Sequence, residues 1–125
     1  MRILLDTHIY LWWLNDAPQL SRSAREMIME AESVHVSSAV IWEAVIKIKL
    51  GRLDADPVEL VAGIRESGFE TLPIYPEHAL ALNRLPDHHK DPFDRMLIAQ
   101  AITEPLHLVT VDALLSSYSD LVIMV

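Results

Sequence analysis

The chain has 125 residues, of which 51% are apolar and none is cysteine, and its formal net charge is −8. This length predicts one domain over residues 1–125, and the lack of cysteine excludes disulfides and thiolate metal sites. The negative charge disfavours binding to a polyanion unless cations neutralise the contact. No stretch is apolar and charge-free over the length of a bilayer, and the N-terminus lacks the layout of a signal peptide, so we expect a cytoplasmic protein that does not bind membranes.

Apolar runs of strand length alternate along the chain with longer segments of helical spacing. In chain order we expect a strand at 2–6, helices at 7–15 and 21–32, a strand at 34–37, helices at 38–51 and 57–67, a strand at 69–74, helices at 76–84 and 92–103, and strands at 107–110 and 121–125. Each of the last three helices begins with proline, the residue favoured at the first helical position. Strands that alternate with helices predict a three-layer α/β/α fold with a mostly parallel central sheet.

Two acidic residues follow predicted strands directly. Asp6 ends the first strand, and Asp112 lies just beyond the fourth. The carboxyl ends of parallel strands meet at one edge of a sheet, which is where ligands bind in such folds. We therefore expect Asp6 and Asp112 at the same edge.

Two further acids lie near the starts of predicted helices. Glu43 shares a narrow polar face with Lys47 in an otherwise apolar helix, a spacing that also suits an ordinary pair on a solvated surface. Asp91 and Asp94 flank Pro92, and Asp91 suits the N-cap of the helix that begins there. Asp94 instead lies on the apolar side of that helix, in line with Leu97, Ile98 and Ala101, where an acid is rare unless its charge is compensated.

Four acids from separate segments can therefore converge at one sheet edge: Asp6, Glu43, Asp94 and Asp112. Carboxylate oxygens suit Mg²⁺ or Mn²⁺, whereas carboxylates crowded without a cation would raise one another's pKa. Cations held in this way support the hydrolysis of phosphodiesters. We expect all four acids to be metal ligands and catalytic residues.

The same residues carry a resemblance to a known family. Residues 4–8 (LLDTH), 42–43 (WE), 89–101 (HKDPFDRMLIAQA) and 108–112 (LVTVD) resemble the motifs of PIN-domain ribonucleases, in particular the VapC-type toxins of bacterial toxin–antitoxin pairs. The resemblance covers essentially the whole chain, and 89–101 is its most specific part. It implies that the acids at the matching positions hold Mg²⁺ or Mn²⁺ and cut RNA. It also implies an antitoxin partner and a homodimer.

Several other residues are candidates for contact with substrate or partners. Arg95, Thr110 and Lys47 are candidates for binding the RNA substrate, with a solvated charge or a local hydrogen bond as the alternative. For His88 and His89, which adjoin each other before the last long helix, we favour a solvated or hydrogen-bonded loop role over a ligand role.

Three tryptophans lie in the apolar helices. Trp12 and Trp13 are consecutive, and we expect one of them in the core and the other at a protein interface. With Trp42, they favour an apolar surface for the dimer and the antitoxin.

Three other functions are compatible with acids at strand ends. A signalling receiver needs a lysine at the end of its last strand, and residues 121–125 contain none. A binding module without chemistry does not need the complete set of four acids. An RNA-processing nuclease without an antitoxin and a non-catalytic binding module of the same fold remain as the alternatives. A small basic DNA-binding protein encoded immediately upstream would favour the toxin.

Overall fold

The computed structural model describes residues 1–125, and all five predicted strands pair in one sheet. The strands are β1 (Arg2–Leu5), β2 (Ser33–Ser37), β3 (Glu70–Leu72), β4 (His107–Thr110) and β5 (Val122–Met124). Their order across the sheet is β3-β2-β1-β4-β5, and every neighbouring pair is parallel. β1 therefore occupies the centre, and its carboxyl end lies beside that of β4, with Leu5 opposite Val109.

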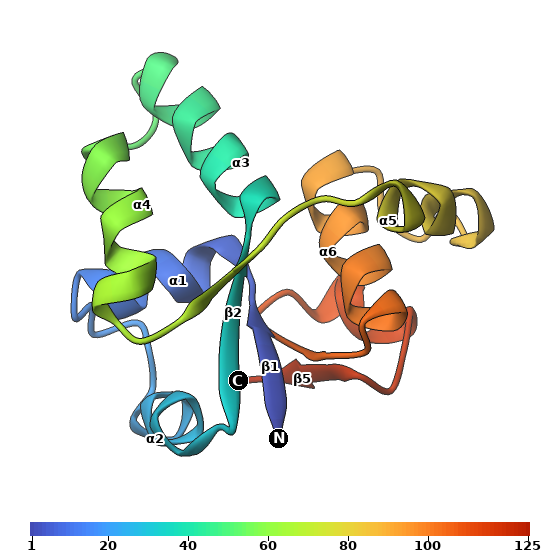
Figure 1. Cartoon of the computed structure of the whole chain (residues 1–125), viewed down its shortest axis with the longest axis horizontal. Coiled ribbons are helices and arrows are strands. Elements are labelled where there is room, and N and C mark those ends of the chain that lie inside the picture. The colour runs from blue at the N-terminus through green and yellow to red at the C-terminus, as the bar shows by residue number, and fades with distance from the viewer.

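Six α-helices connect the strands and cover both faces of the sheet. They are α1 (Thr7–Leu14), α2 (Arg22–Glu30), α3 (Ser38–Lys49), α4 (Pro57–Glu66), α5 (Pro76–Ala81) and α6 (Pro92–Thr103). Figure 1 shows α1, α2 and α4 on one side of β1 and β2, and α5 and α6 on the other. The α/β class and the mostly parallel central sheet predicted from the sequence are confirmed.

Local sequence signals set the starts of most helices. Ser21 and Ser37 cap α2 and α3 with their side-chain oxygens, as expected for serine at the N-cap. Pro57, Pro76 and Pro92 occupy the first turn of α4, α5 and α6. Beyond the end of α3, Gly51 has a φ of 71°, a left-handed conformation that glycine adopts without steric cost.

The core lies between the sheet and its two layers of helices. Ile3, Leu4 and Leu5 of β1 are fully buried, because helices cover both faces of the central strand. Trp12 and Trp13 are both partly buried and both pack against the main core, so the expectation that only one of them would contact the core was wrong. A protein interface at one of the two rings stays a prediction. The Trp13 ring packs against Phe69 and its Nε1 donates to Ser67, whereas the Trp12 ring packs against His8 of the same helix.

Two short 3₁₀ segments depart from the expected elements. The helix expected at 76–84 divides into α5 and η1 (Leu82–Arg84), and η2 (Ala113–Ser117) follows Asp112 where no helix was expected. Both are single turns that are too short to show a hydrophobic period. None of the helices combines the length and the apolar character needed to cross a bilayer.

Candidate metal-binding active site

Asp6 is held at the carboxyl end of β1 by two neighbours. It is the N-cap of α1, and its Oδ1 accepts a hydrogen bond from the Thr7 backbone N–H at 2.7 Å. Its Oδ2 accepts one from the Thr110 hydroxyl at 2.5 Å. The side chain is buried, and this burial raises the pKa of Asp6 although both hydrogen bonds act in the opposite direction. Asp6 is thus a fixed carboxylate with little access to water.

Glu43 is a second buried acid, and it reaches the site from α3. Its Oε1 accepts a hydrogen bond from the Thr7 hydroxyl at 2.7 Å, and its Oε2 pairs with Lys47 Nζ at 2.8 Å. The pair with Lys47 therefore exists, but it does not lie on a solvated face, because Glu43 is only 8% exposed. Thr7 joins Asp6 and Glu43, since its N–H binds the first and its hydroxyl binds the second.

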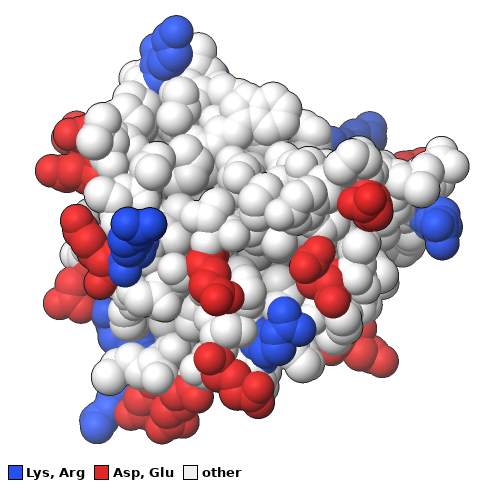
Figure 2. Space-filling model, in the orientation of Figure 1, with Lys and Arg blue, Asp and Glu red and all other residues white.

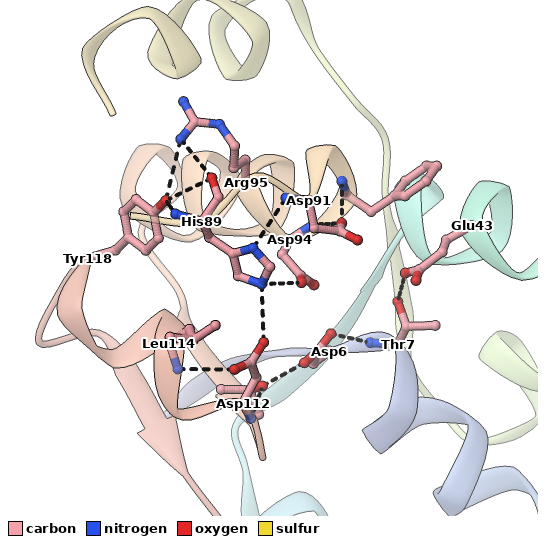
Figure 3. Close-up of polar contacts among 12 residues, drawn as sticks. Asp6, Thr7, Glu43, His89, Asp91, Asp94, Arg95, Asp112, Leu114 and Tyr118 are labelled. Atoms are coloured by element: carbon pink, nitrogen blue, oxygen red, sulfur yellow. Dashed lines mark hydrogen bonds and ion pairs between the residues drawn. The ribbon is translucent and has the colours of Figure 1, made fainter. Parts of the chain in front are cut away.

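The first turn of α6 separates the roles of Asp91 and Asp94. Asp91 is the N-cap, and its Oδ1 accepts hydrogen bonds from the backbone N–H groups of Phe93 and Asp94. The Asp94 side chain is turned toward the other acids (Figure 3). Burial raises the pKa of Asp94 to about 7, and the negative charges of Asp6, Asp91 and Glu43 add to this effect. Asp94 therefore lies within the electrostatic field of the acids of β1 and α3.

Asp112 completes the group from the segment that follows β4. Its Oδ1 accepts a hydrogen bond from the Leu114 N–H at 3.0 Å, so it also caps η2. Its own N–H donates to the Thr110 hydroxyl at 3.0 Å, and that hydroxyl donates to Asp6. Thr110 thereby links the ends of the two adjacent strands β1 and β4.

His89 connects two of the acids directly. Its Nε2 lies 3.1 Å from Asp94 Oδ2 and forms a 3.2 Å hydrogen bond with Asp112 Oδ2. One ligand atom each of His89, Asp94 and Asp112 lies within 4.8 Å of the others. Figure 3 shows the imidazole between the two carboxylates. The hydrogen-bonded loop role favoured for His89 from the sequence agrees with these contacts, but the sequence did not indicate that its partners are Asp94 and Asp112.

The three residues expected to bind substrate all have partners within the protein. Lys47 pairs with Glu43, and Thr110 bridges Asp6 and the Asp112 backbone. The Arg95 guanidinium holds the loop before α6, donating to the Pro86 carbonyl at 2.9 Å. Their contact with RNA stays a prediction. His88 is exposed and its ring packs edge-on against Tyr118, away from the acids.

The donor atoms of this site fit a hard divalent cation. Carboxylate oxygens are the ligands that Mg²⁺ and Mn²⁺ prefer, and those of Asp6, Asp94 and Asp112 are drawn together by Thr110 and His89. The pKa of Asp94 is raised chiefly by burial, and Asp6, Asp91 and Glu43 raise it further, so the protein compensates the ionised carboxylate only in part. A cation would supply the missing charge.

Comparisons with known proteins place these features in one family. The PIN domain family model matches residues 3–121. Ribonuclease VapC22 of Mycobacterium tuberculosis is 30% identical over 118 residues, which cover 93% of this chain and 91% of that protein.

Solved structures of similar shape cover almost the whole chain. VapBC2 from Rickettsia felis, bound to a DNA fragment from its promoter, has a TM-score of 0.73 at 17% identity and covers 100% of this chain and 98% of its own. FitAcB from Neisseria gonorrhoeae has a TM-score of 0.68 at 19% identity, with 98% and 96% covered. A toxin–antitoxin complex from Klebsiella pneumoniae has a TM-score of 0.67 at 19% identity, again with 98% and 96% covered. With its family model matched over most of its length, the chain belongs to the PIN domain family.

Proposed function

We propose that this protein is a divalent-metal-dependent endoribonuclease and the toxin of a VapC-type toxin–antitoxin pair. The observation that carries the proposal is the convergence of Asp6, Glu43, Asp94 and Asp112 from four separate segments at the carboxyl edge of the sheet. Membership of the PIN domain family and the similarity to Ribonuclease VapC22 support it.

Three of the four acids share one place in the proposed chemistry, and Glu43 has another. Asp6, Asp94 and Asp112 would hold Mg²⁺ or Mn²⁺, which when bound lowers the pKa of water and stabilises charge on the scissile phosphate. Thr7 and Thr110 fix the orientation of Asp6, so that its carboxylate needs little rearrangement. Glu43 is tied to Thr7 and Lys47 and lies at the α3 side of the group, where its charge adds to the attraction for a cation.

The proposed substrate is RNA, although the formal net charge of the chain is −8. Bound cations would offset the acids at the edge of the sheet, so that a phosphate can approach. A cytoplasmic location, where RNA is available, belongs to the same proposal.

An antitoxin and a second copy of the chain are the proposed protein partners. Trp42, Ile46 and Leu50 follow one another at i, i+4 spacing along α3, and they are 58%, 37% and 60% exposed. Figure 2 shows a broad area without charged side chains over α3 and α6. An exposed apolar stripe of this kind is typical of a protein-binding surface. The similar solved structure from Klebsiella pneumoniae is a toxin–antitoxin complex.

Cleavage of single-stranded RNA by the purified protein tests the proposal. We expect cleavage with Mn²⁺ or Mg²⁺ and none with EDTA. Asp6→Asn should lower the rate by more than about 100-fold, because loss of an outer contact at a metal site already costs roughly 10–100-fold. Asparagine keeps the N-cap bond to Thr7, so the variant should melt like the wild type in EDTA. Cleavage that persists in EDTA, or that Asp6→Asn retains, would refute the metal-dependent mechanism.

A further inference from the structure

The ring of His89 is fixed by its own loop rather than by the acids alone. The His89 backbone N–H donates to the Tyr118 hydroxyl at 2.7 Å. Arg95 Nη1 lies 3.3 Å from the same hydroxyl and also donates to the Pro86 carbonyl, three residues before His89. The side chain of His89 is only 17% exposed. The loop contacts of Tyr118 and Arg95 therefore hold the His89 ring between Asp94 and Asp112.

The hydrogen bond at the other ring nitrogen decides which tautomer is present. The backbone N–H of Asp91 donates to His89 Nδ1 at 3.2 Å, so Nδ1 presents its lone pair. In a neutral imidazole the proton then resides on Nε2, and Nε2 is a donor. The partners of Nε2 agree, because both are carboxylate oxygens.

The same tautomer argues against His89 as a metal ligand. A histidine that binds a metal through one nitrogen normally donates its other N–H to an acceptor. Here the partner of Nδ1 is itself a donor, and Nε2 carries the proton in place of a free lone pair. The 4.8 Å grouping of His89, Asp94 and Asp112 thus brings together one donor and two acceptors rather than three ligands.

We propose that His89 is a positioning residue whose Nε2–H holds the Asp94 and Asp112 carboxylates beside each other. The two acids come from different elements and repel each other, and the histidine contacts one oxygen, Oδ2, of each. Oδ1 of Asp94 is left for another ligand. The inference rests on the proposed function, since His89 acts only through acids that are proposed to bind the metal.

Two substitutions test the roles of the two ring nitrogens one at a time. His89→Gln places an amide N–H at the position of Nε2 but loses the acceptor at Nδ1. His89→Asn places a side-chain oxygen near Nδ1, where it can accept from Asp91, but does not reach the acids. A residue that only shapes the loop would be replaced better by asparagine. A residue that bridges the acids would be replaced better by glutamine.

The measurement is Mn²⁺ affinity by electron paramagnetic resonance, with thermal melts in EDTA. We expect His89→Asn to weaken Mn²⁺ binding by about 10–100-fold, as for loss of other outer contacts, and His89→Gln to restore most of the affinity. In EDTA, His89→Asn should melt below His89→Gln, because the repulsion between Asp94 and Asp112 is then unrelieved. Unchanged or tighter Mn²⁺ binding in His89→Asn would overturn the proposal.

Two further results separate this inference from the proposed function. Pulsed resonance of the Mn²⁺-loaded wild type should show no directly coordinated ¹⁴N, and a signal from one would make His89 a ligand and overturn the positioning role. The proposed function fails if the wild type binds no Mn²⁺, or if Asp94→Asn binds Mn²⁺ as tightly as the wild type does. The order of the two melting temperatures in EDTA still decides whether the histidine bridges the acids.

Discussion

Asp91 and Asp94 lie in the same turn of chain but experience different surroundings. The Asp91 carboxylate receives two backbone N–H groups at the start of α6, which account for its presence there. Asp94 receives no such compensation, and the pKa of its carboxyl is raised to about 7 by burial and by the neighbouring acids. An acid kept in such a position destabilises the metal-free protein and is retained where it serves a function.

Exchanging each aspartate for asparagine distinguishes these two roles. Asp91→Asn should retain most RNA cleavage, because asparagine caps a helix about as well as aspartate. Asp94→Asn should abolish Mn²⁺-dependent cleavage while the fold remains intact, because it removes a charge from the cation site. The check is cleavage at fixed Mn²⁺ beside thermal melts in EDTA. Full activity in Asp94→Asn would mean that this residue serves only the end of the helix.

Asp94 should also make the stability of the metal-free protein depend on pH. Its pKa is raised from 3.8 to about 7 on folding, so the folded state binds the proton more tightly than the unfolded state. The resulting stabilisation is complete below about pH 4 and is lost as the pH rises through about 7. In EDTA, the melting temperature of Asp94→Asn minus that of the wild type should therefore increase as the pH rises from about 4 to about 7. Above that range the difference should stay constant. A difference between the two proteins that is constant with pH would contradict the shifted pKa.

At the scale of elements, the contact between α1 and α3 can be tested through Thr7. Thr7→Val keeps the shape of the side chain and the backbone N–H that binds Asp6, but it leaves Glu43 Oε1 without its donor. A lost hydrogen bond to a buried charged group costs about 1.5–3 kcal/mol, so the melting temperature should fall. Thr103→Val, at the exposed end of α6, is the matched control. Equal melting of both variants would show that the hydroxyl of Thr7 contributes nothing to stability.

Helices and strands could be predicted from the sequence where the residues that start or end them act through their immediate neighbours. Pro57, Pro76 and Pro92 mark the starts of helices because proline constrains its own φ, whatever the tertiary context. The strand-end positions of Asp6 and Asp112 follow from the buried runs that precede them.

Other features of the site depend on contacts between distant segments. Glu43 is buried at a contact with Thr7, which lies 36 positions away, so a helical wheel of α3 alone shows a solvated pair. The contact of His89 with Asp112 depends on a loop conformation fixed by Tyr118, which no periodic pattern encodes. The segment η2 was not anticipated for a different reason, since its five residues are too few to show a hydrophobic period, although Asp112 caps them locally.

At the scale of the whole molecule, the apolar stripe of α3 should govern association. Ile46→Gln together with Leu50→Gln removes two exposed apolar side chains and should weaken both the proposed self-association and the proposed binding of an antitoxin. Leu80→Gln changes a residue on α5 that is 63% exposed, and it serves as the control. Light scattering after gel filtration reports the dimer, and co-purification reports the antitoxin. A monomeric wild type at high concentration would remove the dimer from the proposal.

The hydrogen bond between Thr110 and Asp6 joins residues that are 104 positions apart, and it sets the order in which the site can form. During synthesis from the N-terminus, Asp6 and Glu43 emerge long before Asp94 and Asp112. The set of acids therefore stays incomplete until Asp112, two residues beyond β4, has been made and β4 has paired with the central strand β1. Pairing between segments this far apart in the sequence has to close a long loop of chain, so we expect it to form late in folding. We therefore expect RNA cleavage only from chains that have been synthesised beyond β4.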